Sequence, residues 1–135
     1  MEFEDDAGAV VRYVRHPSGG GLVSPGATVH DDATVLASAY VEAGARVGPR
    51  ARICVGCWVD RDVLVGPDAV VGEHVHLGPG TRVGAGARVG ARARVGQRVV
   101  VEPGARVEAD TVVPDDAVVT AGPGRRRGKG YGVAA

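Results

Sequence analysis

Hydrophobic side chains recur at every sixth position from Val23 to Val119 without a break. All of these positions hold Val, Ile or Leu, and the side chain four residues further on is mostly small, as in Ala27, Ala33 and Ala39. A period of six fits neither an amphipathic helix nor a hairpin meander. It is typical of a parallel β-helix, in which each six-residue side of the coil is a short strand followed by a turn.

Three six-residue sides close one triangular coil of 18 residues. The 17 hexapeptide repeats therefore predict a single-domain, all-β protein of about five and two-thirds coils. At a strand spacing of roughly 4.8 Å, the resulting prism is roughly 27 Å tall. Glycine is frequent at the second and fourth positions of the hexad, which fits corners that need positive φ or close backbone approach.

The repeat divides the chain into three segments. We expect an N-terminal strand, cap and Gly-rich joint over residues 1–22, the β-helix over 23–122, and a basic, flexible tail over 123–135. Residues 9–14 read as one strand. Such a strand would cover the apolar end of the first coil, because solenoids need capped ends.

Composition excludes several classes of partner. The 135 residues carry 16 basic and 16 acidic side chains, so no net charge attracts the protein to nucleic acid or membrane. No apolar run reaches membrane-spanning length, and the acidic N-terminus is unlike a signal peptide, which together predict a cytoplasmic protein.

Two cysteines are too few for a disulfide scaffold. We expect Cys57 to pack inside the coil, with Cys54 at a corner.

The hexads Val47–Arg52 (VGPRAR) and Val83–Arg88 (VGAGAR) resemble those of the hexapeptide-repeat superfamily. This resemblance covers residues 23–122 and implies a left-handed parallel β-helix that assembles as a homotrimer. The superfamily includes acyltransferases acting on sugars, amino acids and drugs, γ-class carbonic anhydrases, and non-catalytic assembly subunits. The fold by itself does not choose among these functions.

Chemistry-bearing residues gather on one predicted face. Residues 18 apart stack in columns, and the outward sixth hexad position on this face reads Tyr40, Trp58, His76, Arg94, Val112. His74 and His76 flank the inward Val75 and are expected to project from one strand, roughly 6.5–7 Å apart. In the acyltransferases that the chain resembles, a histidine of a central coil is the general base at a trimer interface. His76 or His74 is therefore the predicted base, and a solvated or interface histidine is the alternative.

A stretch without acidic residues, between Glu73 and Glu102, contains five arginines. Guanidinium groups suit phosphates, and an acyl-coenzyme A cosubstrate carries several. The predicted cosubstrate-binding residues are Arg82, Arg88, Arg92 and Arg94. Pairing of these arginines with Glu and Asp of neighbouring coils or subunits is the alternative. Arg88 and Arg106 are expected to be like-charged neighbours on adjacent strands.

Tyr40 and Trp58 form an aromatic column with His76. Such a column can stack an adenine or a sugar. Burial where two prisms meet is the favoured interpretation, so Tyr40 and Trp58 are predicted interface residues.

Three functions remain open on the sequence. The predicted one is an acyl-coenzyme A-dependent O- or N-acyltransferase of a small sugar or amino compound, with no covalently bound cofactor. A non-catalytic structural or assembly β-helix is the alternative. The unbroken repeat favours it, as does the absence of the long loop between hexads that many acyltransferases of the superfamily have. A γ-class carbonic anhydrase-like protein is third, because the four histidines lack the spacing of those enzymes and predict no metal site.

Overall fold

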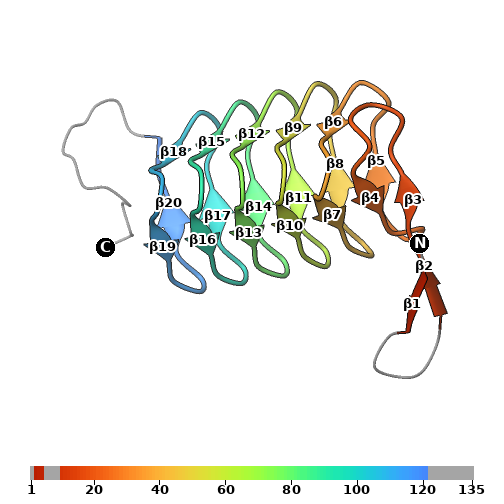
Figure 1. The fold of residues 1–135 in the computed structure, drawn as a ribbon. Helices are drawn as coiled ribbons and strands as arrows, with labels where there is room; N and C mark the ends of the chain where they lie inside the picture. The colour runs from red at the N-terminus through yellow and green to blue at the C-terminus, as the bar shows by residue number, and fades with distance from the viewer. Residues whose placement is uncertain (1, 5–9, 122–135) are drawn as a thin grey trace.

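The structure, a computed structural model, describes residues 2–4 and 10–121. Within these residues every regular element is a β-strand. Strand β1 (Glu2–Glu4) pairs antiparallel with β2 (Val10–Arg12), and this pair projects from one end of the body (Figure 1). The body itself is a stack of coils built from the two-residue strands β4 to β20 (Figure 1). The predicted all-β solenoid is confirmed.

Every third strand of the coil joins the same parallel sheet, so residues 18 apart stand in register. We call the three faces sheets I, II and III. Sheet I contains β3 (Val14–Arg15), β4 (Leu22–Val23), β7 (Tyr40–Val41), β10 (Trp58–Val59), β13 (His76–Leu77), β16 (Arg94–Val95) and β19 (Val112–Val113). Sheet II contains β5 (Thr28–Val29), β8 (Arg46–Val47), β11 (Leu64–Val65), β14 (Arg82–Val83), β17 (Val100–Val101) and β20 (Val118–Val119). Sheet III contains β6 (Thr34–Val35), β9 (Arg52–Ile53), β12 (Val70–Val71), β15 (Arg88–Val89) and β18 (Arg106–Val107).

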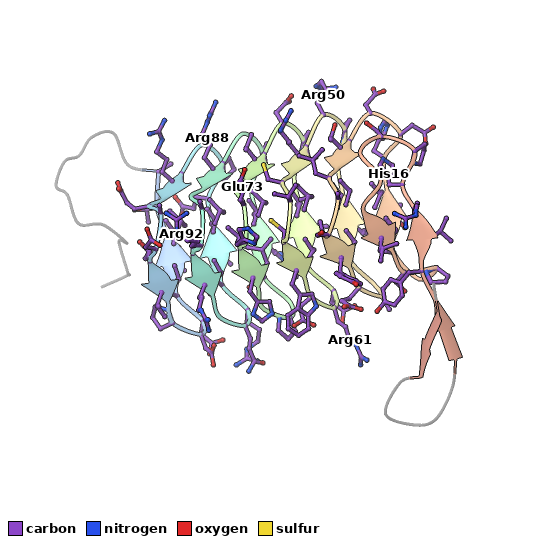
Figure 2. All side chains as sticks on the ribbon, in the orientation of Figure 1. His16, Arg50, Arg61, Glu73, Arg88 and Arg92 are labelled. Atoms are coloured by element: carbon purple, nitrogen blue, oxygen red, sulfur yellow. The ribbon has the colours of Figure 1, made fainter. Side chains whose placement is uncertain are left out.

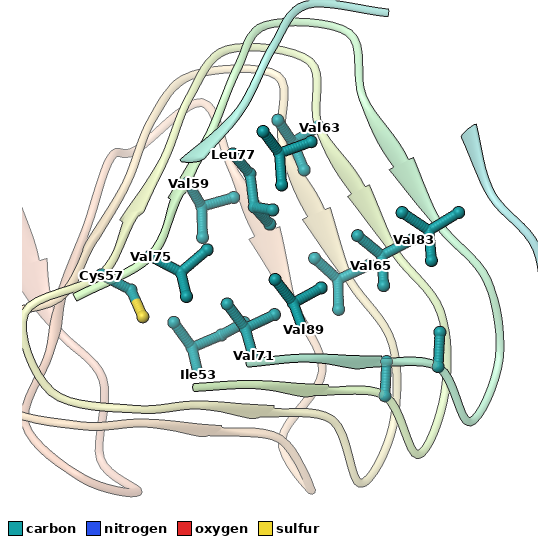
Figure 3. Packing of buried hydrophobic residues seen from close by; sticks show 14 of the residues in the cluster. Ile53, Cys57, Val59, Val63, Val65, Val71, Val75, Leu77, Val83 and Val89 are labelled. Atoms are coloured by element: carbon teal, nitrogen blue, oxygen red, sulfur yellow. The ribbon is translucent and has the colours of Figure 1, made fainter. Parts of the chain in front are cut away.

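The core is a narrow column inside the triangular coil. Side chains of the first and fifth hexad positions point inward, as Val59, Val65 and Leu77 do in Figure 3. Leu77 is fully buried, and Cys57 is 1% exposed, so the inward placement expected of Cys57 is confirmed. The inward side chains form one buried cluster that runs through the stacked coils, because a single coil cannot bury its apolar edge alone.

In most corners between sheets the fourth hexad position has positive φ. At Arg50, for example, φ is 62° and the N–H of Ala51 donates to the carbonyl of Gly48 at 3.3 Å. Positive φ at only one central residue is the mark of a type II turn. Gly86 occupies this position with φ of 69°. The second hexad position has a different requirement: a Cβ added to Gly84 would lie 2.5 Å from the backbone nitrogen of Pro103 on the next coil.

These two glycines provide a matched test of the corner geometry. Gly84→Ala is expected to lower the free energy of unfolding by about 2–3 kcal/mol, because the added methyl group forces adjacent coils apart. Gly86→Ala meets open space and is expected to cost about 1 kcal/mol for its positive φ. Urea unfolding of both variants measures the difference. Equal losses in the two variants would contradict the close approach at Gly84.

The N-terminal segment continues sheet I and closes part of the first coil. Strand β3 pairs antiparallel with β4, and the ring Nε2 of the buried His16 lies 2.9 Å from the carbonyl oxygen of Ala33. The N–H of Gly21 donates to the carbonyl of Val35 at 2.7 Å. These contacts occupy carbonyl groups of the first coil that have no coil beneath them.

The expectation of one strand over residues 9–14 is wrong. The chain changes partner at Tyr13, because β2 pairs with β1 whereas β3 pairs with β4. Residue 9 and the predicted tail, 123–135, lie outside the described residues. The division into three segments stays a prediction.

No helix long and apolar enough to cross a membrane occurs in residues 2–4 and 10–121.

Candidate active site

His76 lies in the middle of an outward column on sheet I. The register pairs Trp58 with His76 and His76 with Arg94, as the 18-residue spacing predicts. The rings of Trp58 and His76 stack with their centroids 4.4 Å apart and their planes inclined by 16°. The indole therefore covers one face of the imidazole. The ring stays at the surface, and the His76 side chain is 39% exposed.

Asp60 orients this imidazole. Its Oδ2 lies 3.1 Å from Nε2 of His76, and the Asp60 side chain is only 17% exposed. When the carboxylate accepts a hydrogen bond from Nε2–H, the lone pair of the neutral ring is on Nδ1. His76 with Asp60 therefore has the arrangement of a general base and the group that orients it.

His74 does not share the strand of His76, and the predicted placement of both rings on one strand is wrong. His74 occupies the fourth hexad position with φ of 58°, whereas β13 begins at His76. The strands are only two residues long, so the alternation expected for a longer strand breaks at the corner. The His74 ring lies over Gly56, where a Cβ would collide with it.

A second polar cluster lies on the other side of Trp58. The Glu42 carboxylate accepts a hydrogen bond from the Tyr13 hydroxyl at 2.7 Å and another from the Trp58 Nε1–H at 2.9 Å. The Tyr13 and Tyr40 rings meet edge to face, with centroids 5.6 Å apart. Burial, together with Glu42, raises the pKa of Tyr13 to about 12, so Tyr13 stays a donor at neutral pH. These residues line an open pocket of about 460 Å³ with Ser38, Gly56 and Cys57.

Asp60, Glu42 and Tyr13 are not among the site residues predicted from the sequence. Asp60 and Glu42 both occupy the second hexad position, two residues after an outward side chain of sheet I. An acidic residue at this position, beside a column of aromatic and histidine side chains, is a signal in the repeat that points to both carboxylates. Tyr13 lies outside the repeat, so no periodicity points to it.

One coil distributes its arginines over all three sheets. Arg82 lies on sheet II, Arg88 on sheet III and Arg94 on sheet I, so a single chain does not bring the predicted cosubstrate residues together. Arg94 is the one beside His76, and the two residues line an open groove of about 400 Å³ that also includes Gln97 and Asp115. Arg88 extends outward from β15 (Figure 2) and stands in register with Arg106, as expected.

Arg92 is placed differently from the other predicted arginines. It sits at a corner with φ of 62°, and its guanidinium makes a two-pronged contact with Asp110, with Nε–Oδ1 at 2.7 Å and Nη2–Oδ2 at 3.1 Å. This contact holds the pKa of Asp110 below its usual range. Arg98 pairs with Asp116 in the same way. The alternative of pairing between coils therefore holds for Arg92 and Arg98.

The two cysteines differ in burial. Cys57 is buried with its Sγ 2.8 Å from the carbonyl oxygen of Gly72, and burial raises the pKa of its thiol to about 11. Cys54 is a half-buried free thiol at a corner. Within the described part of the chain, no group of three His, Cys, Asp or Glu side chains is arranged to hold a metal ion.

Alkylation tests this difference between the thiols. At pH 8, iodoacetamide is expected to modify Cys54 in the folded protein and to leave Cys57 unmodified, because the thiolate is the reactive form. In urea both thiols react, which provides the internal control. Peptide mass spectrometry reads the two sites separately, and equal rates in the folded protein would contradict the inward position of Cys57.

Comparisons with known proteins agree with the repeat and the fold. A model of the family described as bacterial transferase hexapeptide (six repeats) matches residues 56–91. A hexapeptide transferase family protein from Anaplasma phagocytophilum superposes with a TM-score of 0.54 at 16% identity, over 71% of this chain and 70% of that one. At this identity the likeness shows the fold alone. The predicted hexapeptide-repeat superfamily and left-handed parallel β-helix are confirmed.

Other solved structures are similar over part of their length. Perosamine N-acetyltransferase from Caulobacter crescentus, in a mutant form with CoA and GDP-perosamine, is 33% identical over 78% of this chain and 46% of its own, with a TM-score of 0.43. The acetyltransferase domain of PglB from Neisseria gonorrhoeae, in complex with acetyl coenzyme A, is 29% identical over 73% of this chain and 53% of its own, with a TM-score of 0.44. The chain thus spans about half the length of these two proteins. No curated protein matches it.

Proposed function

We propose that this hexapeptide-repeat β-helix protein is an acyl-coenzyme A-dependent O- or N-acyltransferase of a small sugar or amino compound. The observation that carries the proposal is the placement of His76, oriented by Asp60 and stacked on Trp58, at the edge of a groove that contains Arg94. The match of residues 56–91 to a family of bacterial transferase repeats supports it, because this stretch contains the same histidine.

In the proposed reaction, Nδ1 of His76 takes the proton from the acceptor's hydroxyl or amino group as the acceptor oxygen or nitrogen attacks the thioester carbonyl carbon. The carbonyl electron pair moves to oxygen and forms a tetrahedral oxyanion, which a backbone N–H stabilises. Collapse of this intermediate breaks the C–S bond, and coenzyme A leaves as a thiol with the proton from His76. Asp60 holds the ring through Nε2–H throughout.

The proposed assembly is a homotrimer in which sheet I of one copy packs on sheet II of the next. The exposed large apolar side chains of β4 to β20 all lie on these two sheets: Trp58 and Val112 on sheet I, Leu64 and Val100 on sheet II. The outward column of sheet III contributes none, since Val70 is half-buried and its neighbours are arginines. Two different surfaces that meet head to tail close into a ring when the rotation is right. This places the predicted interface residues Tyr40 and Trp58 at the seam.

Threefold packing brings a second arginine to His76. If the symmetry axis is parallel to the coil axis, residues six positions apart differ in height by a third of a coil, roughly 1.6 Å. The partner subunit's Arg82 then lies level with His76, and the partner subunit's Leu64 lies level with Trp58. Arg94 and the partner subunit's Arg82 would bind the phosphates of acyl-coenzyme A. Arg88 on sheet III and the ion-paired Arg92 are outside this seam.

The proposed cosubstrate also indicates a compartment. Acyl-coenzyme A is a cytoplasmic metabolite, so the proposal includes a cytoplasmic location. No covalently bound cofactor takes part in the proposed reaction.

Release of free thiol from acetyl-coenzyme A tests the reaction. With panels of primary amines and of sugars, we expect thiol release to depend on one class of acceptor and to match the acetylated product measured by mass spectrometry. A mixture without acceptor is the control for hydrolysis. Thiol release that no acceptor accelerates, with no acetylated product, would contradict the proposal.

A further inference from the structure

The pocket beside Trp58 has an aromatic wall and a carboxylate. Its lining includes the rings of Tyr13, Tyr40 and Trp58 and the carboxylate of Glu42, and no basic side chain among residues 13–121. Both donors to Glu42, the Tyr13 hydroxyl and the Trp58 indole N–H, are neutral groups. Among the side chains of residues 13–121, no cationic one lies within ion-pair distance of Glu42. The carboxylate is therefore held by two neutral donors and has no ion-pair partner among these residues.

The charge and the rings favour the same kind of ligand. A carboxylate has about four acceptor sites, and the two protein donors leave further lone pairs on Glu42. The faces of indole and phenol rings attract cations through their quadrupoles. A positively charged nitrogen entering this pocket meets both kinds of group, whereas a phosphate or carboxylate would be repelled.

We propose that this pocket binds an organic ammonium group of the acceptor. The binding itself needs no catalysis, but the role as an acceptor subsite rests on the proposed transferase function. Tyr13, from the segment that precedes the repeat, supplies one wall of the pocket. The N-terminal segment thereby contributes to specificity as well as to the first coil.

The distance to His76 limits the ligand. The pocket lies on the Tyr40 side of Trp58, and His76 stacks against the Trp58 ring from the adjacent strand. Tyr40 and His76 are two strand spacings apart, roughly 9.6 Å. The acceptor is therefore a compound with an ammonium group roughly 5–10 Å from a nucleophilic amine or hydroxyl. Diamines, amino alcohols and amino sugars have this form.

Trp58 fluorescence reports ligand binding beside this ring, because Trp58 is the only tryptophan of the chain. The probes are 1,5-diaminopentane and its uncharged counterpart 1,5-pentanediol, at constant ionic strength. We expect a saturable change with the diamine and at least a ten-fold weaker response to the diol. Glu42→Gln is expected to weaken diamine binding about ten-fold, the loss of one charge-assisted contact. The matched control Glu108→Gln, on another face, should leave it unchanged.

A second variant keeps the test decisive if Glu42→Gln alters the fold. Ser38 lines the pocket from an exposed corner, so Ser38→Lys places a tethered ammonium there and is expected to exclude the diamine. Equal affinity for diamine and diol, or unchanged diamine affinity in both variants, would overturn the proposal. Dissociation of the assembly by Glu42→Gln with unchanged diamine affinity would also overturn it and assign the carboxylate to the subunit seam. None of these readings requires coenzyme A or turnover, so they are independent of the transferase reaction.

Discussion

Replacing His76 with alanine is expected to lower kcat/KM for acetyl transfer about a thousand-fold, within the range that a lost general base costs. In the proposed reaction the imidazole is the proton acceptor, and Asp60 contacts its Nε2 at 3.1 Å. The melting temperature should change by only a few degrees, because His76 lies on the surface and the inward Leu77 is untouched. Thiol release and thermal unfolding of the same preparation separate the two effects.

His74 supplies the matched control. His74→Gly removes an imidazole two residues away at a position of positive φ, which glycine adopts without strain. We expect kcat/KM within about three-fold of the wild type, since His74 lies over Gly56 rather than on the strand of His76. A thousand-fold loss in His74→Gly with activity retained in His76→Ala would exchange the roles of the two residues and contradict the site described here.

Replacing Leu64 with glutamate is expected to dissociate the assembly into single chains. The variant buries a charge in the middle of the proposed seam between sheets I and II, where the partner subunit's Trp58 would meet it. Light scattering coupled to gel filtration should show a mass of 13.7 kDa for the variant and about three times that for the wild type. Activity should fall with the assembly, because in the proposed trimer only the partner subunit's Arg82 reaches His76.

Val70→Glu is the control for this change. Val70 is also an outward apolar residue, in register with Arg52 and Arg88 on sheet III, which the proposed seam leaves free. Its glutamate would face two arginines, so we expect the trimer and the melting temperature to be retained. Dissociation by Val70→Glu but not by Leu64→Glu would assign the seam to sheet III and move Arg88 towards the active site.

The period of six determines most of the fold, and particular residues show why. From Val23 to Val119, every sixth residue is apolar and points inward, so the residue before it points outward. The outward column of Tyr40, Trp58, His76 and Arg94 therefore follows from counting in steps of 18. The same counting places Cys57 in the core. Handedness does not follow from the pattern, because inward and outward positions alternate in the same way in a coil of either hand.

The details of the site depend on corners and side-chain conformations that periodicity does not describe. His74 departs from the predicted arrangement because each strand is only two residues long and the corner before it has positive φ. The contact of Asp60 with His76 joins residues 16 apart, which is close to the coil period without being in register with it. Tyr13 belongs to the non-repeating segment, so its contact with Glu42 appears only in three dimensions.

The arginines also show that the pattern of charges along the sequence does not predict which side chains lie together. Arg92 and Arg94 are close in sequence, yet one is paired with Asp110 at a corner and the other lies beside His76. The acid-free stretch that they share predicts one phosphate site, because it measures proximity along the sequence and not around the coil. The coil places neighbouring hexads on different faces, so only residues a multiple of 18 apart share a column.

Calorimetric titration with acetyl-coenzyme A tests the central claim most directly. The proposed transferase must bind this cosubstrate, and the binding can be measured without knowledge of the acceptor. We predict one saturable site per chain, weakened about ten-fold by Arg94→Ala through loss of a charge-assisted contact to phosphate. Arg106→Ala on sheet III should leave the affinity unchanged. Absence of heat at high micromolar acetyl-coenzyme A, in a protein that remains folded and assembled, would contradict the transferase and favour a structural β-helix whose sheet I is a contact surface.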